Sequence, residues 1–125
     1  MIKLLLVDDE EEFVRALAER LELRGFLPKV ALKGEQALHL IAEGVADVML
    51  LDLKMPGMDG CEVLRRVKRA YPHVQVVILT GHGSEKDEQT ARQRGAFEYL
   101  RKPVDIEQLV VVLKKAHGAA GRKEG

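Results

Sequence analysis

Residues 45–60, VADVMLLDLKMPGMDG, contain a short apolar run that ends abruptly on one carboxylate. The run, DVMLL at 47–51, is almost unbroken and of strand length, which is typical of a parallel strand covered on both faces. Asp52 follows it, and the glycines and proline of residues 54–60 predict a loop that leads into a helix. Ligands of open α/β sheets bind outside the carboxyl ends of the strands. The stretch therefore predicts an aspartate displayed at a loop mouth, although an isolated aspartate here can also simply cap a turn or the next helix.

Three further apolar runs of strand length also end on polar side chains. Asp8 and Asp9 follow residues 2–7 (IKLLLV), Thr80 ends residues 74–80 (VQVVILT), and Lys102 follows residues 97–101 (FEYLR). Parallel strands place their carboxyl ends at one edge of a sheet, so we expect these side chains to share one pocket with Asp52.

Segments of helical periodicity alternate with these runs, which favours an α/β domain. Helices are expected near residues 13–24, 34–43, 62–71, 84–94 and 105–117, and a further strand at 26–32. The right-handed crossover rule leaves few topologies for such a chain. A five-stranded parallel sheet of order 2-1-3-4-5, in a doubly wound, flavodoxin-like three-layer sandwich, fits best, because it places the first strand beside the Asp52 strand and Pro28 on an edge.

Length and apolar patterning fit one globular domain. A chain of 125 residues with 46% hydrophobic residues leaves no room for a second domain. Phe13, Val14, Leu17, Leu21 and Leu23 recur at roughly helical spacing and predict the apolar face of the first helix. We expect residues 1–118 to form the domain and residues 119–125 to form a flexible tail.

The overall composition argues against several classes of partner. Twenty basic residues balance twenty acidic ones, so nothing favours binding to nucleic acid or to an anionic membrane surface. No apolar run approaches the roughly 18 residues that cross a bilayer, and no signal peptide is recognisable. The single cysteine, Cys61, cannot form an internal disulfide and matches a reducing compartment. We therefore expect a cytoplasmic protein.

The expected pocket has the chemistry of a phosphoryl-transfer site. Clustered carboxylates repel one another unless a cation joins them, and hard divalent ions prefer oxygen ligands, so Mg²⁺ is the expected cofactor. A bound metal, the Lys102 ammonium and the Thr80 hydroxyl can neutralise phosphoryl oxygens, which leaves Asp52 as the nucleophile. The alternative, a purely structural network of Lys102 with the aspartates, explains neither Thr80 nor the repeated placement at strand ends.

Four segments, VDDE, LLDLKMPGMDG, ILTGHG and YLRKP, resemble in this order the receiver domain of two-component response regulators over about residues 2–117. The resemblance implies that Asp52 is the phosphoacceptor. It implies these metal ligands: Asp9 directly, Asp8 mostly through water, Asp52, and the backbone carbonyl of Lys54. It further implies that Thr80 and Lys102 hold the phosphoryl group, that Tyr99 is the switch residue, and that the bond before Pro103 is cis.

Such a domain is a phosphoacceptor switch and not a conventional enzyme. The resemblance implies a sensor histidine kinase or phosphotransfer protein as donor, and a downstream output protein or domain, or a phosphorylation-dependent homodimer, as the reader. The fourth helix, fifth strand and fifth helix would form the surface that is read. LKMPGMDG and TGHG are also similar to receivers that precede transcription-activating ATPase domains.

Two alternatives are weighed against the switch. A haloacid-dehalogenase-like phosphatase needs a second aspartate two residues after its nucleophile, and that position is Lys54. A pseudo-receiver that is never phosphorylated usually lacks one acidic or conducting residue, and none is missing here.

Overall fold

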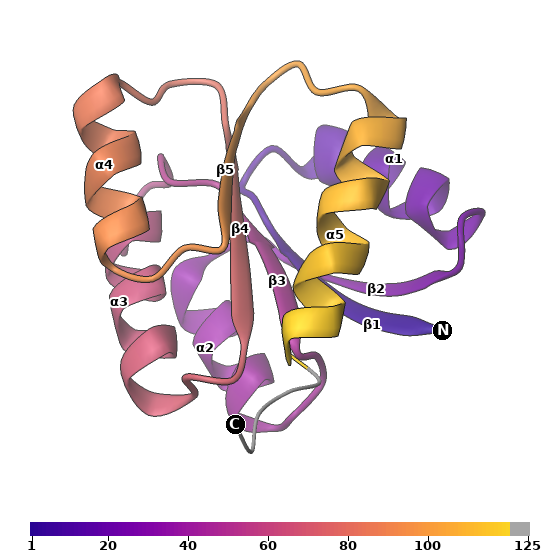
Figure 1. The fold of residues 1–125 in the computed structure, drawn as a ribbon, viewed down its shortest axis with the longest axis horizontal. Coiled ribbons are helices and arrows are strands. Elements are labelled where there is room, and N and C mark those ends of the chain that lie inside the picture. Colours follow the sequence, from indigo (N-terminus) through magenta and orange to yellow (C-terminus); the bar gives the residue numbers. More distant parts are fainter. Residues whose placement is uncertain (121–125) are drawn as a thin grey trace.

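Five short segments form one parallel sheet in the computed structural model, which describes residues 1–120 (Figure 1). The strands are β1 (Ile2–Val7), β2 (Phe26–Ala31), β3 (Val48–Leu51), β4 (Gln75–Thr80) and β5 (Glu98–Arg101). Their order is β2-β1-β3-β4-β5, and every neighbouring pair is parallel. The predicted topology is confirmed, and Pro28 lies in the edge strand β2, where a missing N–H is tolerated.

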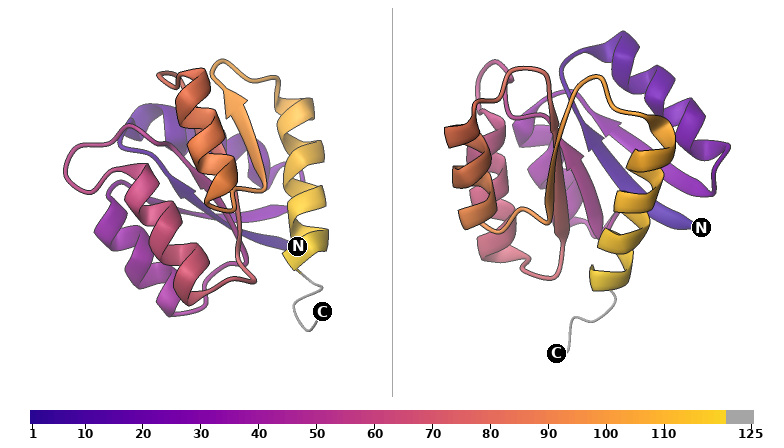
Figure 2. Two further views of the ribbon diagram at one scale, coloured as in Figure 1. Left: turned by 60° about the vertical axis from the view of Figure 1, so that its left-hand side comes forward. Right: turned by 45° about the horizontal axis from the view of Figure 1, so that its top comes forward.

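Five helices cover the two faces of the sheet. They are α1 (Glu11–Glu22), α2 (Gly34–Ala42), α3 (Gly60–Ala70), α4 (Glu85–Gln93) and α5 (Ile106–Ala120). Helices α1 and α5 pack on one face, and α2, α3 and α4 pack on the other (Figures 1 and 2). The molecule is therefore the expected three-layer sandwich. No helix within residues 1–120 combines the length and apolar character that a membrane crossing requires.

Side chains alternate along each strand between two apolar cores. In β1, for example, Leu5 and Val7 enter the core under α2 and α3, while Leu4 and Leu6 enter the core under α1 and α5. The central strands are buried on both faces, which accounts for their nearly unbroken apolar sequences. What remains polar at the sheet is therefore concentrated at the strand ends.

Helix starts follow their capping side chains. Asp59 accepts a hydrogen bond from the Glu62 amide at the start of α3, and Ser84 forms a capping box with Asp87 at the start of α4. The Asp105 carboxylate accepts a hydrogen bond from the Gln108 amide at the start of α5. These caps confirm Ser84 and Asp105 as helix starts.

Two details at the helix ends differ from expectation. Leu23 is 85% exposed because α1 ends at Glu22, and Phe13 is 39% exposed because the buried face of α1 consists of Val14, Leu17 and Leu21. Helix α5 continues to Ala120, whose side chain is buried, so residues 119 and 120 belong to the helix and not to the expected tail. The rest of the expected tail, residues 121–125, lies outside the described part of the chain.

Candidate functional site

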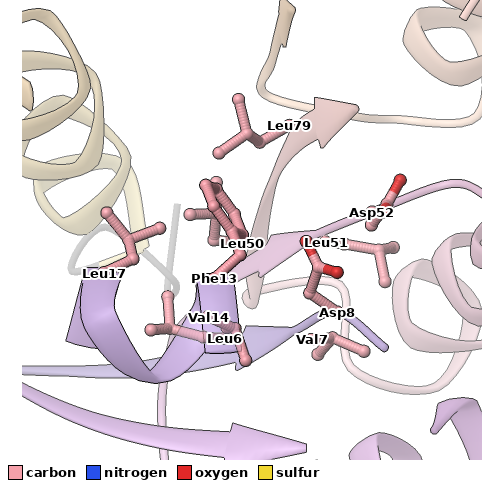
Figure 3. A pocket seen from close by; sticks show the side chains of 10 residues that line it. All are labelled: Leu6, Val7, Asp8, Phe13, Val14, Leu17, Leu50, Leu51, Asp52 and Leu79. Atoms are coloured by element: carbon pink, nitrogen blue, oxygen red, sulfur yellow. The ribbon is translucent and has the colours of Figure 1, made fainter. Parts of the chain in front are cut away.

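Asp8 and Asp52 lie side by side at the carboxyl edge of the sheet. Val7 and Leu51 are paired across β1 and β3, and the Asp52 amide donates a hydrogen bond to the Val7 carbonyl at 3.0 Å. The next residue of each strand is therefore an aspartate, and both are nearly buried, with 5% and 4% exposure. Figure 3 shows the two carboxylates at the neighbouring strand ends. The strand order thus converts two distant sequence positions into a carboxylate pair.

The ammonium of Lys102 lies among these carboxylates. Its Nζ is 2.8 Å from Asp8 Oδ2, 2.8 Å from Glu10 Oε1 and 3.5 Å from Asp52 Oδ2. The Lys102 side chain is only 15% exposed. The largely shielded ammonium offsets the repulsion among the acidic oxygens around it.

Glu10 is a site residue that the sequence analysis missed. One carboxylate oxygen from each of Asp8, Glu10 and Asp52 lies within 4.8 Å of the others. Asp9, expected as a direct metal ligand, is exposed and does not belong to this cluster. The sequence carries a signal for it, because Glu10 is the third acidic residue after the strand in VDDE, but the strand-end pattern selects only Asp8 and Asp9.

Burial and hydrogen bonding shift the acidities at the site in opposite directions. Burial raises the pKa of Asp8, and the hydrogen bond from Lys102 offsets this only in part. The hydrogen bond from Lys102 lowers the pKa of Glu10. Burial acts to lower the pKa of Lys102, but the hydrogen bonds to Asp8 and Glu10 raise it above its ordinary value. The lysine is therefore charged at neutral pH. The all-oxygen donor set of the cluster also fits Mg²⁺.

Thr80 and Lys54 approach the pair from the neighbouring segments. Thr80, at the end of β4, is fully buried, and its carbonyl accepts a hydrogen bond of 2.9 Å from the Lys102 amide. The Lys54 amide donates to Asp52 Oδ1 at 3.2 Å, whereas the Lys54 side chain turns outward, with Nζ 3.8 Å from the Asp87 carboxylate. Backbone and side chain of Lys54 therefore contact different partners.

Gly60 allows α3 to begin directly against the Asp52 backbone. A Cβ built on Gly60 would overlap the Asp52 carbonyl oxygen and lie 2.5 Å from Leu53 Cα. The Gly60 amide donates to the Leu53 carbonyl at 2.8 Å. This close approach fixes the loop that carries Asp52.

Tyr99 is buried in this structure, with 5% exposure. A Cβ built on Gly83 would overlap the Tyr99 hydroxyl and lie 3.1 Å from Thr80 Cγ2, so the ring lies near Thr80. The hydroxyl has no hydrogen-bond partner among residues 1–120, and the Arg101 guanidinium lies 5.4 Å from the ring centroid. The peptide bond between Lys102 and Pro103 is cis, as expected.

Fold and site together define a class: a doubly wound α/β domain with an acidic, lysine-containing site at the carboxyl edge of its central strands. The family model for the response regulator receiver domain matches residues 4–114. The chain belongs to the receiver domains of two-component response regulators.

Several known proteins are similar to this chain. A putative NtrX-like response regulator of Rickettsia bellii is 39% identical over 118 residues, covering 93% of this chain and 25% of its own length. The transcriptional regulatory protein CpxR of Escherichia coli is 39% identical over 121 residues, covering 94% of this chain and 51% of its own length. The chain thus spans between a quarter and about half of the length of these relatives.

Solved structures agree in fold. A response regulator receiver domain protein from Clostridium thermocellum has a TM-score of 0.89 and 36% identity, with 99% of this chain and 98% of that chain covered. A CheY-like receiver domain protein from Methanospirillum hungatei has a TM-score of 0.91 and 27% identity over the whole of both chains. The receiver domain of NtrX from Brucella abortus has a TM-score of 0.86 and 29% identity, with 92% of this chain and 98% of that chain covered.

Proposed function

We propose that this receiver domain is a phosphoacceptor switch in which Asp52 receives a phosphoryl group in the presence of Mg²⁺. One observation carries the proposal: the buried Asp52 carboxylate lies at the end of a central strand, with the Lys102 ammonium 3.5 Å away and an acidic cluster around it. A carboxylate in such surroundings can act as a nucleophile toward phosphorus.

The neighbouring side chains supply what a phosphoryl group needs. An Asp52 oxygen forms the new bond to phosphorus as the bond between phosphorus and the donor's imidazole nitrogen breaks, and the imidazole takes up a proton. Lys102 and the Thr80 hydroxyl would then bind the oxygens of the transferred group. When bound, Mg²⁺ neutralises part of the negative charge that these oxygens carry. Asp9, Asp8, Asp52 and the Lys54 carbonyl are the proposed ligands of the ion. Glu10 lies close enough to Asp8 and Asp52 to join them, whereas Asp9 would have to turn toward the cluster.

The proposed partners follow from the family. A sensor histidine kinase or a phosphotransfer protein would donate the phosphoryl group, and an output protein or domain, or a second copy of the domain, would read the α4, β5 and α5 surface. Tyr99 lies in β5 near Thr80, so phosphorylation of Asp52 would change the position of the Tyr99 ring and, through it, the α4, β5 and α5 surface. A cytoplasmic location stays a prediction.

Phosphorylation by a small phosphodonor tests the proposal. Wild-type protein incubated with acetyl phosphate and Mg²⁺ is expected to gain one phosphoryl group by intact mass, and Asp52→Asn is expected to gain none. Asp59→Asn is the matched control, because Asp59 lies in the same loop but caps α3. Absence of labelling in the wild type would favour the pseudo-receiver, and equal labelling of Asp52→Asn would identify a different nucleophile.

A further inference from the structure

Glu10 occupies the N-cap position of α1 without capping the helix. Its side chain makes no cap hydrogen bond. N-cap residues are usually short side chains that accept a hydrogen bond from the first turn, and glutamate is not among the favoured ones. The Glu10 carboxylate instead lies 2.8 Å from Nζ of Lys102, the residue that directly follows β5. The Glu10 side chain therefore binds the Lys102 ammonium and does not cap α1.

The partners of Lys102 are unequally placed. Its Nζ bonds Asp8 and Glu10 at 2.8 Å each, and it lies 4.4 Å from the centroid of the Phe13 ring. All three contacts come from the end of β1 and the start of α1. Asp52 Oδ2 is more distant, at 3.5 Å. The ammonium thus makes its shortest contacts with the β1–α1 segment, and its contact with the proposed phosphoacceptor is longer.

The exposed Phe13 ring and Glu10 carboxylate together form an outer cradle for this ammonium. Phe13 is 39% exposed, and the Lys102 ammonium lies over the face of its ring, which is a favourable cation–π contact. Glu10 has a side-chain exposure of 62%, so its contact with Lys102 is made at the mouth of the site. Neither residue is required to fill the core.

We propose that Glu10, assisted by Phe13, is a positioning residue that restrains Lys102 and competes with a phosphoryl group on Asp52 for the lysine ammonium. The ammonium has three N–H donors, and two of them are used by Asp8 and Glu10 in this structure. Lys102 can bind either Glu10 or a phosphoryl group on Asp52, and the contact with Glu10 stabilises only the first of these two positions. Loss of the Glu10 contact therefore favours the position in which Lys102 binds the phosphoryl group. This inference rests on the proposed function of Asp52.

Binding of beryllofluoride, a phosphoryl mimic, at saturating Mg²⁺ tests the competition. Glu10→Gln is expected to bind the mimic about two- to fivefold more tightly than wild type, the range expected for loss of one exposed ion pair. Glu12→Gln is the matched control: it removes one negative charge from the first turn of α1, two residues after Glu10, whereas the ion pairs of Lys102 are with Asp8, Glu10 and Asp52. Affinity in Glu10→Gln that is unchanged, weaker, or raised equally in Glu12→Gln would overturn the proposal.

A second variant separates positioning from helix stability. Glu10→Asn supplies a favoured N-cap side chain and removes the carboxylate, so its melting temperature should equal or exceed that of wild type. It should bind beryllofluoride as tightly as Glu10→Gln does. A tighter complex in Glu10→Gln but not in Glu10→Asn would mean that Glu10 acts through α1 and not through Lys102.

Solvent exchange of the Lys102 ammonium protons, measured by NMR without any phosphoryl mimic, reports the restraint itself. We expect slow exchange in wild type and faster exchange in Glu10→Gln, with Glu12→Gln unchanged. Equal exchange in wild type and Glu10→Gln would contradict the restraint. If wild type binds no beryllofluoride, the proposed function fails, and the exchange measurement alone decides whether Glu10 positions the lysine.

Discussion

Asp8 is a buried carboxylate, and its burial disfavours the charged form more than the contact with Lys102 favours it. Its pKa is raised by burial, which means that the folded protein disfavours the charged form. The unfolded chain therefore releases this proton at lower pH, and the stability contributed by Asp8 falls as the pH rises above the ordinary value of 3.8. At neutral pH the charge on Asp8 therefore lowers the free energy of unfolding.

We predict that Asp8→Asn increases the free energy of unfolding by about 1 kcal/mol at pH 7. In the wild type, the backbone amide of Glu10 donates a hydrogen bond of 2.9 Å to Asp8 Oδ1. The side-chain oxygen of asparagine can accept the same hydrogen bond. Urea denaturation in the absence of metal measures the change. Asp9→Asn is the control, because Asp9 is exposed and its neutralisation should have little effect. A less stable Asp8→Asn would show that the bond to Lys102 outweighs the burial.

Gly83 determines where the Tyr99 ring can lie. A Cβ at this position would overlap the hydroxyl and lie 2.9 Å from Cζ of the ring, so Gly83→Ala should force Tyr99 outward. We predict stronger acrylamide quenching of Tyr99 fluorescence in Gly83→Ala, measured in a Tyr71→Phe background. Gly81→Ala is the control, since the nearest atoms to its Cβ, both in Lys102, are 3.8 Å away. Unchanged quenching in Gly83→Ala would mean that the loop moves and the ring stays.

Individual site residues were predictable where they directly follow a strand. Asp8, Asp52, Thr80 and Lys102 lie at strand ends, and the sheet order alone brings them together. Glu10 could not be found in this way, because its place in the site depends on the conformation of a long side chain and on where Lys102 lies. The strand pattern therefore predicts which residues lie at the sheet edge, but only the structure shows which long side chains reach the site.

Helix α3 depends on its first residue for its place beside β3. We predict that Gly60→Ala lowers the free energy of unfolding by about 3 kcal/mol, because its Cβ would meet the backbone of Asp52 and Leu53 and neither can move without disturbing the sheet edge. Thermal and urea unfolding measure the loss.

Gly118→Ala is the matched control for Gly60→Ala. Gly118 lies within α5, and a Cβ there meets nothing within 4 Å. This substitution should leave stability unchanged or raise it by up to about 1 kcal/mol, because alanine favours helices. Equal effects of the two substitutions would show that helix propensity, and not the contact with the Asp52 loop, determines the response.

Glu62 in the first turn of α3 should titrate far below an ordinary glutamate. Hydrogen bonds from Arg65 and Arg66 lower its pKa from 4.5 to about 2. Because the folded pKa is depressed, the stabilisation is present above about pH 4.5 and is lost as the pH falls toward 2. NMR titration of the Glu62 carboxyl carbon is expected to show the low midpoint. In the double variant Arg65→Gln, Arg66→Gln the midpoint should return toward 4.5, and a wild-type midpoint already near 4.5 would contradict the ion pairs.

The elements themselves were largely predictable, and their ends less so. Apolar periodicity located all five strands and five helices of residues 1–120. Leu23 was misplaced because it continues the apolar spacing of α1 beyond the residue where the helix ends. Helix α5 was expected to end early because glycine favours helix ends, yet Ala116 and Ala120 continue its buried face past Gly118. Tertiary packing therefore extends α5 beyond the end that its sequence predicts.

At the scale of the whole molecule, the sheet order places the proposed reading surface of α4, β5 and α5 along one edge of the sheet, with only β4 between β5 and the Asp52 strand β3. Contacts run from the site to this surface: the Lys54 side chain approaches Asp87 in α4, and Arg92 in α4 pairs with Glu98 in β5. Tyr99 follows Glu98 directly. The topology was predictable because right-handed crossovers leave few alternatives for a parallel sheet.

Chemical trapping of the phosphorylated residue tests the central claim most directly. Borohydride reduces an aspartyl phosphate to homoserine, so the modified position can be found by peptide sequencing in a mass spectrometer. After incubation with acetyl phosphate and Mg²⁺, we predict homoserine at position 52 and at none of the other aspartates. Homoserine at Asp8, Asp9 or Asp59, or none at any position in protein that remains folded, would contradict the assignment of Asp52 as the phosphoacceptor.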